Sequence, residues 1–283
     1  MNCFQLISEK LSYLKDKGIE TSKFELRILM EHVLGLKPNQ TLSLSQELTN
    51  DQALEFSRLV EIRSQHKPID KIIKSKGFYK YEFKVSEDVL SPRPDTEILL
   101  EKAIELVKNK KDALILEFGV GSGCIITSIL AETPSAFGVG IDISDKALKI
   151  AKENAETLLV HDRLQLINAS WFDDDIVKKF KPQFDIIVSN PPYIKTSEIP
   201  FLDIEVKNFD PLIALDGGDD GLRDYRRISQ ISANLLKDDG FLLFEVGENQ
   251  ALDVINIGNK SGFATYEILK DLNNIERCII LKK

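Results

Sequence analysis

Residues 113–142 read ALILEFGVGSGCIITSILAETPSAFGVGID. Two short apolar runs, 113–118 and 137–142, flank a helical pattern at 125–132, and a glycine-rich turn joins the first run to the helix. Short β-branched runs bounded by glycine indicate strands, whereas the longer apolar pattern between them indicates a helix. The segment therefore predicts a strand–helix–strand unit, from which parallel sheets are built.

The same alternation continues downstream. A helical pattern follows at 145–155, and further short apolar runs lie at 184–190 and 241–247. This order predicts an α/β fold with a doubly wound, mainly parallel Rossmann-like sheet and helices on both faces. We expect ligands to bind at the carboxyl ends of its strands.

The first 75 residues have a different pattern, with three helical segments and no strand signal. The second of these segments opens with Ser22 and Glu25 in the spacing of a capping box. Residues 77–90 then alternate aromatic and polar side chains, which predicts a β-hairpin. We expect a small helical domain at 1–75, a hairpin linker at 76–93 and the α/β domain at 94–283.

The composition excludes several classes of protein. Of the 283 residues, 43% are hydrophobic and 29% are charged, which is typical of globular domains. Cys3, Cys124 and Cys278 are scattered, so neither a disulfide scaffold nor a cysteine metal site is expected, and no metal is predicted. The N-terminus is charged and no run of about 18 apolar residues occurs, which favours a cytoplasmic protein with no membrane partner.

The charge distribution argues against a strongly basic nucleic-acid binder. The net charge is 37 minus 45, or −8. Residues 1–80 carry 13 basic and 10 acidic side chains, or +3, which leaves 24 and 35, or −11, for residues 81–283. The slightly basic first part and the acidic second part are therefore consistent with two units in different surroundings.

The glycine-rich turn is the first candidate binding element. It comprises Gly119, Val120, Gly121, Ser122 and Gly123, and it lies where a strand becomes a helix. Glycines there let the backbone approach a ligand, with free helix N–H groups facing it. The third glycine of a dinucleotide fingerprint is replaced by Cys124, which favours S-adenosylmethionine over NAD. The alternative is a purely structural role, because a tight strand-to-helix turn requires glycine even without a ligand.

Asp142 strengthens the binding interpretation. It ends the second strand, 19 residues after Gly123, where a carboxylate can accept hydrogen bonds from both ribose hydroxyls of a nucleoside. The alternative is that Asp142 caps the following helix. Ser144 and Asp145 are better placed for that role.

The chemistry motif is Asn190-Pro191-Pro192-Tyr193, at the carboxyl end of another predicted strand. The prolines remove two backbone donors and favour extended geometry, so nearby carbonyls remain free to accept hydrogen bonds. The Asn190 side-chain oxygen and the Pro191 carbonyl can accept both N–H bonds of an amide NH₂, while Tyr193 stacks on the amide plane. A proline-stiffened turn is the structural alternative.

No histidine is expected to act as a base. His32 and His66 lie in the helical region and His161 lies in a predicted loop, so each is interpreted as structural or solvated. Methyl transfer from a sulfonium needs a dry, positioned site rather than a strong base.

These motifs together resemble the bacterial release-factor glutamine methyltransferases, the HemK/PrmC family. The resemblance covers essentially the whole chain and rests on the glycine-rich turn, Asp142, Asn190-Pro191-Pro192-Tyr193, Pro92-Arg93-Pro94-Asp95-Thr96-Glu97, and Asp216-Gly217-Gly218 with Asp220-Gly221-Leu222. It implies methyl transfer from S-adenosylmethionine to the side-chain amide nitrogen of glutamine in the Gly-Gly-Gln motif of class 1 peptide release factors.

The resemblance also implies roles for particular residues. Gly119 to Gly123 would hold the methionine end of the cofactor, Asp142 its ribose and Trp171 its adenine. Asn190 would contact both cofactor and glutamine, and Pro191, Pro192 and Tyr193 would complete the amide pocket. Residues 1–75 would be the substrate-docking domain of a monomeric enzyme that has no direct nucleic-acid partner.

Several alternatives stay open. Trp171 can also be a core aromatic, and the segment that starts at Pro92 either begins a helix capped by Asp95 or Thr96, or forms a wall of the cofactor pocket. Three residues depart from the family pattern: Ser91 stands where isoleucine is usual, Ser170 where an acidic residue commonly precedes the tryptophan, and Glu117 where aspartate is frequent.

Three other functions compete with this interpretation. An adenine-N6 nucleic-acid methyltransferase would use the same Asn-Pro-Pro-Tyr motif on a flipped base, but it requires a basic groove. A non-catalytic cofactor-binding module would not need that motif. A nicotinamide oxidoreductase is opposed by Cys124.

Overall fold

A computed structural model describes residues 1–19, 23–36, 40–178, 180 and 183–283. The chain forms two compact units. One consists of Met1–Ser75 together with Asp203–Phe209, and the other consists of Lys76–Leu202 and Asp210–Lys283.

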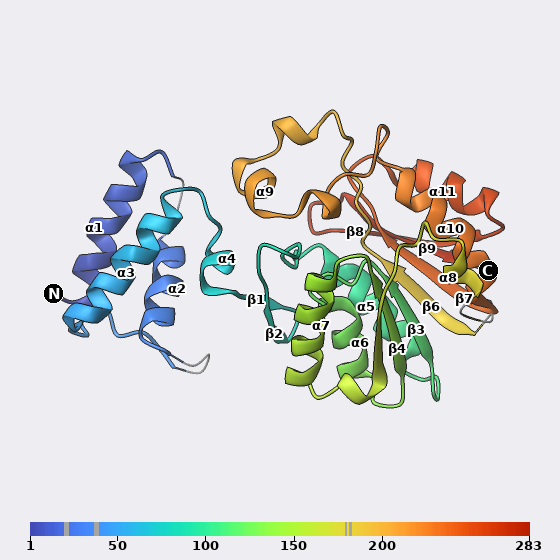
Figure 1. Ribbon diagram of the computed structural model, residues 1–283, viewed down its shortest axis with the longest axis horizontal. Coiled ribbons are helices and arrows are strands. Elements are labelled where there is room, and N and C mark those ends of the chain that lie inside the picture. Colours follow the sequence, from blue (N-terminus) through green and yellow to red (C-terminus); the bar gives the residue numbers. More distant parts are fainter. Residues whose placement is uncertain (20–22, 37–39, 179, 181–182) are drawn as a thin grey trace. The chain divides into compact units, whose positions relative to one another are not determined.

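The first unit is helical (Figure 1). Its helices are α1 (Cys3–Asp16), α2 (Lys23–Val33), α3 (Asn50–Arg63), α4 (Ile69–Ile73) and α9 (Ile204–Phe209). Leu14, Leu26 and Phe56 are fully buried in its core. Capping boxes begin α1 at Asn2 and α3 at Thr49, whereas the predicted capping box at Ser22 lies outside the described residues.

A buried arginine joins two sequence-distant parts of this unit. Arg63 has only 2% of its side chain exposed, and its guanidinium forms a 2.6 Å ion pair with Glu205 of α9. It also donates a hydrogen bond of 3.4 Å to the Lys67 carbonyl. Burying a guanidinium is unfavourable unless a carboxylate and carbonyls satisfy it, so α9 supplies the charge partner that α3 requires.

The predicted hairpin is present, but it is shorter and lies earlier in the chain. It pairs β1 (Ser75–Phe78) with β2 (Tyr81–Lys84). The chain leaves the strand after Lys84 because the Ser86 hydroxyl accepts the Asp88 N–H in a local turn. Buried Asn154 accepts the Lys84 N–H at 2.8 Å and donates to the Lys84 carbonyl at 3.0 Å, which fixes β2 beside α7 (Asp145–Thr157).

The second unit is built on a seven-stranded sheet with the order β5-β4-β3-β6-β7-β9-β8 (Figure 1). The strands are β3 (Leu114–Phe118), β4 (Phe137–Asp142), β5 (Leu164–Asn168), β6 (Phe184–Ser189), β7 (Leu236–Glu245), β8 (Ala264–Lys270) and β9 (Glu276–Lys282). β3 to β7 pair in parallel, and β9 is antiparallel to both β7 and β8. The predicted doubly wound, mainly parallel sheet is therefore confirmed.

Helices cover both faces of this sheet. One face packs against α5 (Thr96–Val107), α6 (Cys124–Glu132) and α7, and the other against α10 (Arg223–Leu235) and α11 (Ala251–Lys260), with α8 (Asp175–Lys178) beside α10. Neighbouring strand residues such as Ile115 and Leu116 belong to different buried clusters because successive side chains point to opposite faces. Among the described residues, no helix combines the length and apolar composition needed to cross a bilayer.

The start of α5 corrects one prediction. Asp95 occupies the N-cap position but makes no capping hydrogen bond, and Thr96 is the first helical residue. Asp95 has right-handed helical backbone angles instead of the extended ones that a capping side chain needs. Its carboxylate lies 3.4 Å from the Arg277 guanidinium instead.

Asp185 stabilises the edge of the sheet where the parallel strands begin. Its carboxylate accepts hydrogen bonds from the Leu114 N–H at 2.9 Å, Lys237 Nζ at 2.8 Å and Lys110 Nζ at 3.3 Å. Burial disfavours the charged form, but the hydrogen bonds from Lys237, Leu114 and Lys110 outweigh it and lower the pKa of Asp185. The carboxylate is therefore more stable in the folded chain than in the unfolded one.

We predict that Asp185→Asn lowers the free energy of unfolding by about 1–2 kcal/mol at pH 7, because the lysines lose their charged acceptor. A lowered pKa stabilises the fold above the unfolded value of about 4, and this contribution disappears as the pH falls through the lowered pKa. The difference between wild type and variant in urea unfolding should be constant from pH 6 to 8 and shrink below about pH 4. Exposed Asp238 provides the control, since Asp238→Asn should change stability by less than about 0.5 kcal/mol. A difference that grows in acid would contradict the prediction.

Candidate active site

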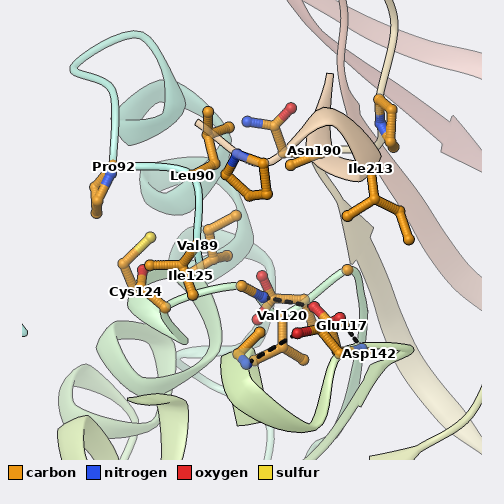
Figure 2. A pocket seen from close by; sticks show the side chains of 18 of the residues that line it. Val89, Leu90, Pro92, Glu117, Val120, Cys124, Ile125, Asp142, Asn190 and Ile213 are labelled. Atoms are coloured by element: carbon orange, nitrogen blue, oxygen red, sulfur yellow. Dashed lines mark hydrogen bonds between the residues drawn. The ribbon is translucent and has the colours of Figure 1, made fainter. Parts of the chain in front are cut away.

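A cavity lies where β3, β4 and β6 end (Figure 2). Of the residues predicted from the sequence, those that line it are Gly119, Val120, Gly121, Ser122, Asp142, Trp171, Asn190 and Pro192. Gly123, Pro191 and Tyr193 are also described by the structure but are not among the lining residues. Segments far apart in the sequence therefore meet in one cavity within the second unit.

The glycine-rich turn packs closely against α7 and also leaves open space on the cavity wall. Gly119, Gly121 and Gly123 have φ angles of 77°, 54° and 79°, in the left-handed region that favours glycine. A Cβ at Gly123 would lie 3.0 Å from the Ala151 Cβ, so this glycine is needed for close packing against α7. A Cβ at Gly121 would meet nothing within 4 Å, so the turn leaves open space there, on the wall of the cavity.

Asp142 supports the turn from the next strand. Its Oδ2 accepts the Gly121 N–H at 2.9 Å and its Oδ1 accepts the Ser144 N–H at 2.9 Å. Ser144 is the cap of α7, and its side chain accepts the Ala147 N–H, so Asp142 does not fill that role. Burial raises the pKa of Asp142 although these backbone hydrogen bonds lower it. Each carboxylate oxygen keeps a lone pair for a ligand in the cavity.

Glu117 is a second carboxylate on the cavity wall (Figure 2). It is 1% exposed, and its Oε2 accepts the Ile126 N–H at 3.0 Å in the first turn of α6. Burial raises the pKa of Glu117 well above its usual value, and the charge of Asp142 adds to this effect. A positively charged ligand next to these two acidic groups would favour their ionised forms.

Trp171 is both a packed aromatic and a cavity residue, so the two alternatives raised by the sequence are compatible. Its ring packs edge-on against Phe118, with the centroids 6.4 Å apart, and it lies next to Gly119. The indole N–H donates to Asp224 Oδ1 at 2.9 Å. Asp224, which the sequence reasoning missed, is 1% exposed and is also paired with Arg223 at 3.1 Å. This pair holds the indole in place at the cavity wall.

Asn190 enters the cavity from the end of β6 (Figure 2). Its Nδ2 donates to the Thr96 hydroxyl at 3.4 Å. Within the part of the chain that the structure describes, nothing donates a hydrogen bond to Asn190 Oδ1 or to the Pro191 carbonyl. Both oxygens therefore receive no hydrogen bond from the described residues, and their role as acceptors for a ligand amide stays a prediction.

Tyr193 follows the cavity residue Pro192 in the chain but does not line the cavity itself. Its carbonyl accepts a hydrogen bond from Gln250 Nε2 at 3.0 Å, and its ring packs against the core of the sheet face that carries α10. Burial raises the pKa of Tyr193 to about 12, so the phenol is neutral at physiological pH. Gln250 was missed from the sequence because nothing local links it to a residue 57 positions earlier.

The segment Asp216-Gly217-Gly218 supports the Asn-Pro-Pro-Tyr backbone. Ile194 and Asp216 form a parallel bridge, in which the Ile194 N–H donates to the Leu215 carbonyl and the Gly217 N–H to the Ile194 carbonyl. A Cβ at Gly217 would lie 2.7 Å from the Pro192 carbonyl oxygen and 2.8 Å from the Tyr193 Cα. Only glycine lets these two backbones approach so closely.

Ser91 and Glu245 complete the polar surroundings of the cavity. Ser91 lines the cavity and is 3% exposed, and its hydroxyl has no hydrogen-bond partner among the described residues. Glu245, at the end of β7, is also 3% exposed, and burial raises its pKa to about 7 although the polar side chains of Thr96 and Asn190 lower it. The sequence offers no local signal for Glu245, since it resembles any polar residue that ends a strand.

We predict that Gly217→Ala lowers the free energy of unfolding by about 1–3 kcal/mol, because the new methyl group overlaps backbone atoms that cannot rotate away. Gly77→Ala is the control, since a Cβ at Gly77 meets nothing within 4 Å. Urea unfolding should show a change within about 1 kcal/mol for the control. Equal stability of the two variants would contradict the close approach at Pro192.

Known proteins share both parts of this sequence. The family model described as the PrmC N-terminal domain matches residues 5–73, and the one described as the methyltransferase small domain matches residues 94–202. Proteins named "Release factor glutamine methyltransferase" from Rhodospirillum rubrum and Fusobacterium nucleatum are 37% and 38% identical to the chain. The alignments cover 95% and 98% of this chain, and 82% and 78% of those proteins. The one from Thermodesulfovibrio yellowstonii is 38% identical, with 92% of each chain covered. This similarity confirms the resemblance seen in the motifs, and the chain belongs to the release factor glutamine methyltransferase family.

Proposed function

We propose that the protein transfers a methyl group from S-adenosylmethionine to the side-chain amide nitrogen of the glutamine in the Gly-Gly-Gln motif of class 1 peptide release factors. The observation that carries this proposal is the pair of unused acceptors, Asn190 Oδ1 and the Pro191 carbonyl, at the end of β6. Asn190 lines the same cavity as the glycine-rich turn and Asp142, Pro191 follows it in the chain, and the family name of the relatives points to the same substrate.

Acceptor oxygens, an aromatic ring and open space in the cavity suit separate parts of S-adenosylmethionine. When bound, this cofactor supplies an electrophilic methyl group on a positively charged sulfur. Asp142 retains lone pairs for the two ribose hydroxyls, and the Trp171 ring gives the adenine an apolar surface. The open space at Gly121 admits the methionine end of the cofactor, and its positive charge would offset the cost of ionising the carboxyls of Glu117 and Asp142, whose pKa values burial raises.

The chain's contribution to the chemistry is to orient the amide nitrogen. An amide NH₂ is a poor nucleophile because its lone pair is delocalised into the carbonyl. Two N–H bonds accepted by Asn190 Oδ1 and the Pro191 carbonyl direct the nitrogen at the methyl group and stabilise the pyramidal form that attacks. The methylated nitrogen then loses its proton to water. Tyr193 contributes through its backbone, which Gln250 holds, and stacking of its ring on the amide stays a prediction.

A methyl-transfer assay with labelled S-adenosylmethionine tests the substrate and the position together. The acceptors are a purified class 1 release factor, its variant with Gln→Ala in the Gly-Gly-Gln motif, duplex DNA and RNA. Label on the wild-type factor alone supports the proposal. Label on nucleic acid, or equal label on both factors, would overturn it.

Asn190→Ala should lower the rate of transfer by about a hundredfold or more while the fold is retained, because it removes an acceptor that positions the nitrogen. Thermal unfolding of the variant should match that of wild type. Asn234, an exposed residue of α10, provides the control, since Asn234→Ala should retain normal transfer. A fully active Asn190→Ala enzyme would remove the amide-orienting role.

Asp142→Ala should chiefly weaken cofactor binding, by about 10- to 100-fold in Kd, because hydrogen bonds to a carboxylate are lost. Trp171 is the single tryptophan of the chain and lines the cavity, so its fluorescence reports binding directly. Titration with S-adenosylmethionine measures Kd for wild type, for Asp142→Ala and for Asp145→Ala, an exposed aspartate of the same turn. An unchanged Kd for Asp142→Ala would exclude the ribose contact.

A further inference from the structure

We propose that Gln250 is a positioning residue for methyl transfer: its side-chain amide holds the end of the Asn-Pro-Pro-Tyr segment and thereby fixes the two acceptors assigned to the substrate nitrogen. The inference rests on the proposed function, because it assigns a further residue to the orientation of the same substrate amide. It also gives a role to Gly221 of the Asp220-Gly221-Leu222 motif, which is not among the residues that line the cavity.

The Gln250 amide connects three segments of the second unit. Its Nε2 donates hydrogen bonds to the Tyr193 carbonyl at 3.0 Å and to the Gly221 carbonyl at 3.3 Å, and its Oε1 accepts the Gly247 N–H at 3.1 Å. A primary amide has two N–H donors and one acceptor oxygen, so both donors are used and the two ends of the group cannot be exchanged. The side chain therefore has one orientation, with its NH₂ directed at the end of the Asn-Pro-Pro-Tyr segment.

The Gln250 side chain does not serve the helix that it begins. Gln250 is the N-cap residue of α11, a position where a side chain commonly accepts an N–H of the first helical turn. Its side chain makes no such hydrogen bond. It is half-buried, whereas the two residues before it, Glu248 and Asn249, are exposed. The amide is therefore directed at the neighbouring loops and not at its own helix.

Two glycines make room for this amide. Gly221 has a φ angle of 72°, and a Cβ there would overlap the Tyr193 carbonyl oxygen and lie 2.8 Å from Gln250 Nε2. A Cβ at Gly247 would lie 2.7 Å from Gln250 Oε1 and 2.9 Å from Cδ2 of the Tyr193 ring. The backbone of Gly247 lies outside the left-handed region, so its conformation does not itself require glycine. The close approach of the amide and the tyrosine does require it.

Two prolines carry the position of Tyr193 back to the acceptors. The rings of Pro191 and Pro192 fix φ at about −65° and leave no N–H, so the segment has few ways to bend. Its start is set by β6, where Ser189 pairs with Phe118 of β3 and donates its hydroxyl to the Phe118 carbonyl at 2.8 Å. Its end is set by the hydrogen bond from the glutamine amide to the Tyr193 carbonyl. A stiff segment held at both ends presents its acceptors in one geometry.

Loss of this anchor should slow the chemical step more than it weakens binding. The substrate nitrogen must approach the methyl carbon in line, and a misplacement of about 1 Å can lower a rate by about a hundredfold. The acceptors are needed most when the nitrogen becomes pyramidal, so kcat should fall while KM for the release factor changes little. Cofactor binding is assigned to other residues, among them Asp142 and Trp171, so Kd for S-adenosylmethionine should also change little.

The test compares Gln250→Glu and Gln250→Ala with wild type in release-factor methylation by labelled S-adenosylmethionine. Glutamate keeps the length of the side chain and an acceptor for the Gly247 N–H, but its carboxylate has no donor for the two carbonyl oxygens. Alanine removes the whole amide. Gln230→Glu and Gln230→Ala, at an exposed position of α10, are the matched controls. Titration of Trp171 fluorescence gives Kd and the concentration of binding-competent sites, so that kcat is expressed per folded enzyme.

We expect both Gln250 variants to lower kcat about 10- to 100-fold, with Kd for the cofactor and KM for the factor within about threefold of wild type. Both Gln230 controls should retain the wild-type kcat. If kcat per binding-competent site in Gln250→Glu stays within about twofold of wild type, or if only Kd or KM changes, the inference is overturned while the proposed function stands. If wild type transfers no label to the factor, both fail.

Discussion

The parallel pairing of β3 with β4 on one side and with β6 on the other is the constraint on which the cavity depends. Phe118 of β3 lies opposite Ile141 of β4 and opposite Ser189 of β6. The residues that follow these three are Gly119, Asp142 and Asn190. One row of paired residues across the sheet therefore places all three candidate binding elements next to one another. A shift of one residue in either pairing would separate them and reverse their faces.

Acidic groups from β3, β4 and α10 surround this row of strand ends. Glu117, Asp142 and Asp224 are each satisfied by a specific donor: the N–H of Ile126, the N–H of Gly121 and the indole N–H of Trp171. Each of these hydrogen bonds fixes a piece of the cavity wall as well as satisfying a carboxylate. These carboxylates therefore orient the segments that form the cavity wall. Hydrogen bonds shape the cavity as much as packing does.

The part of the fold and site that could be predicted from sequence is the part with a local signal. The glycine-rich turn, Asp142 and Asn190 each follow a recognisable strand, and the carboxyl-end rule then brings them together. Thr96, Asp224 and Gln250 act on groups 53 to 94 positions away, so no short-range pattern indicates them. The predicted cap at Asp95 was wrong for the same reason, because a tertiary ion pair with Arg277 competes for its carboxylate.

The ion pair between Arg63 and Glu205 affects when the first unit can be completed during synthesis of the chain. Glu205 lies 142 positions after Arg63, and the segment Asp203–Phe209 that carries it belongs to the same compact unit as the N-terminal helices. A ribosome adding about 5–20 residues per second needs roughly 7–28 s to cover that distance. During this interval the emerging helices contain a guanidinium whose carboxylate has not yet been made. The first unit, although it begins the chain, therefore cannot be completed until residues 76–202 of the second unit have been made.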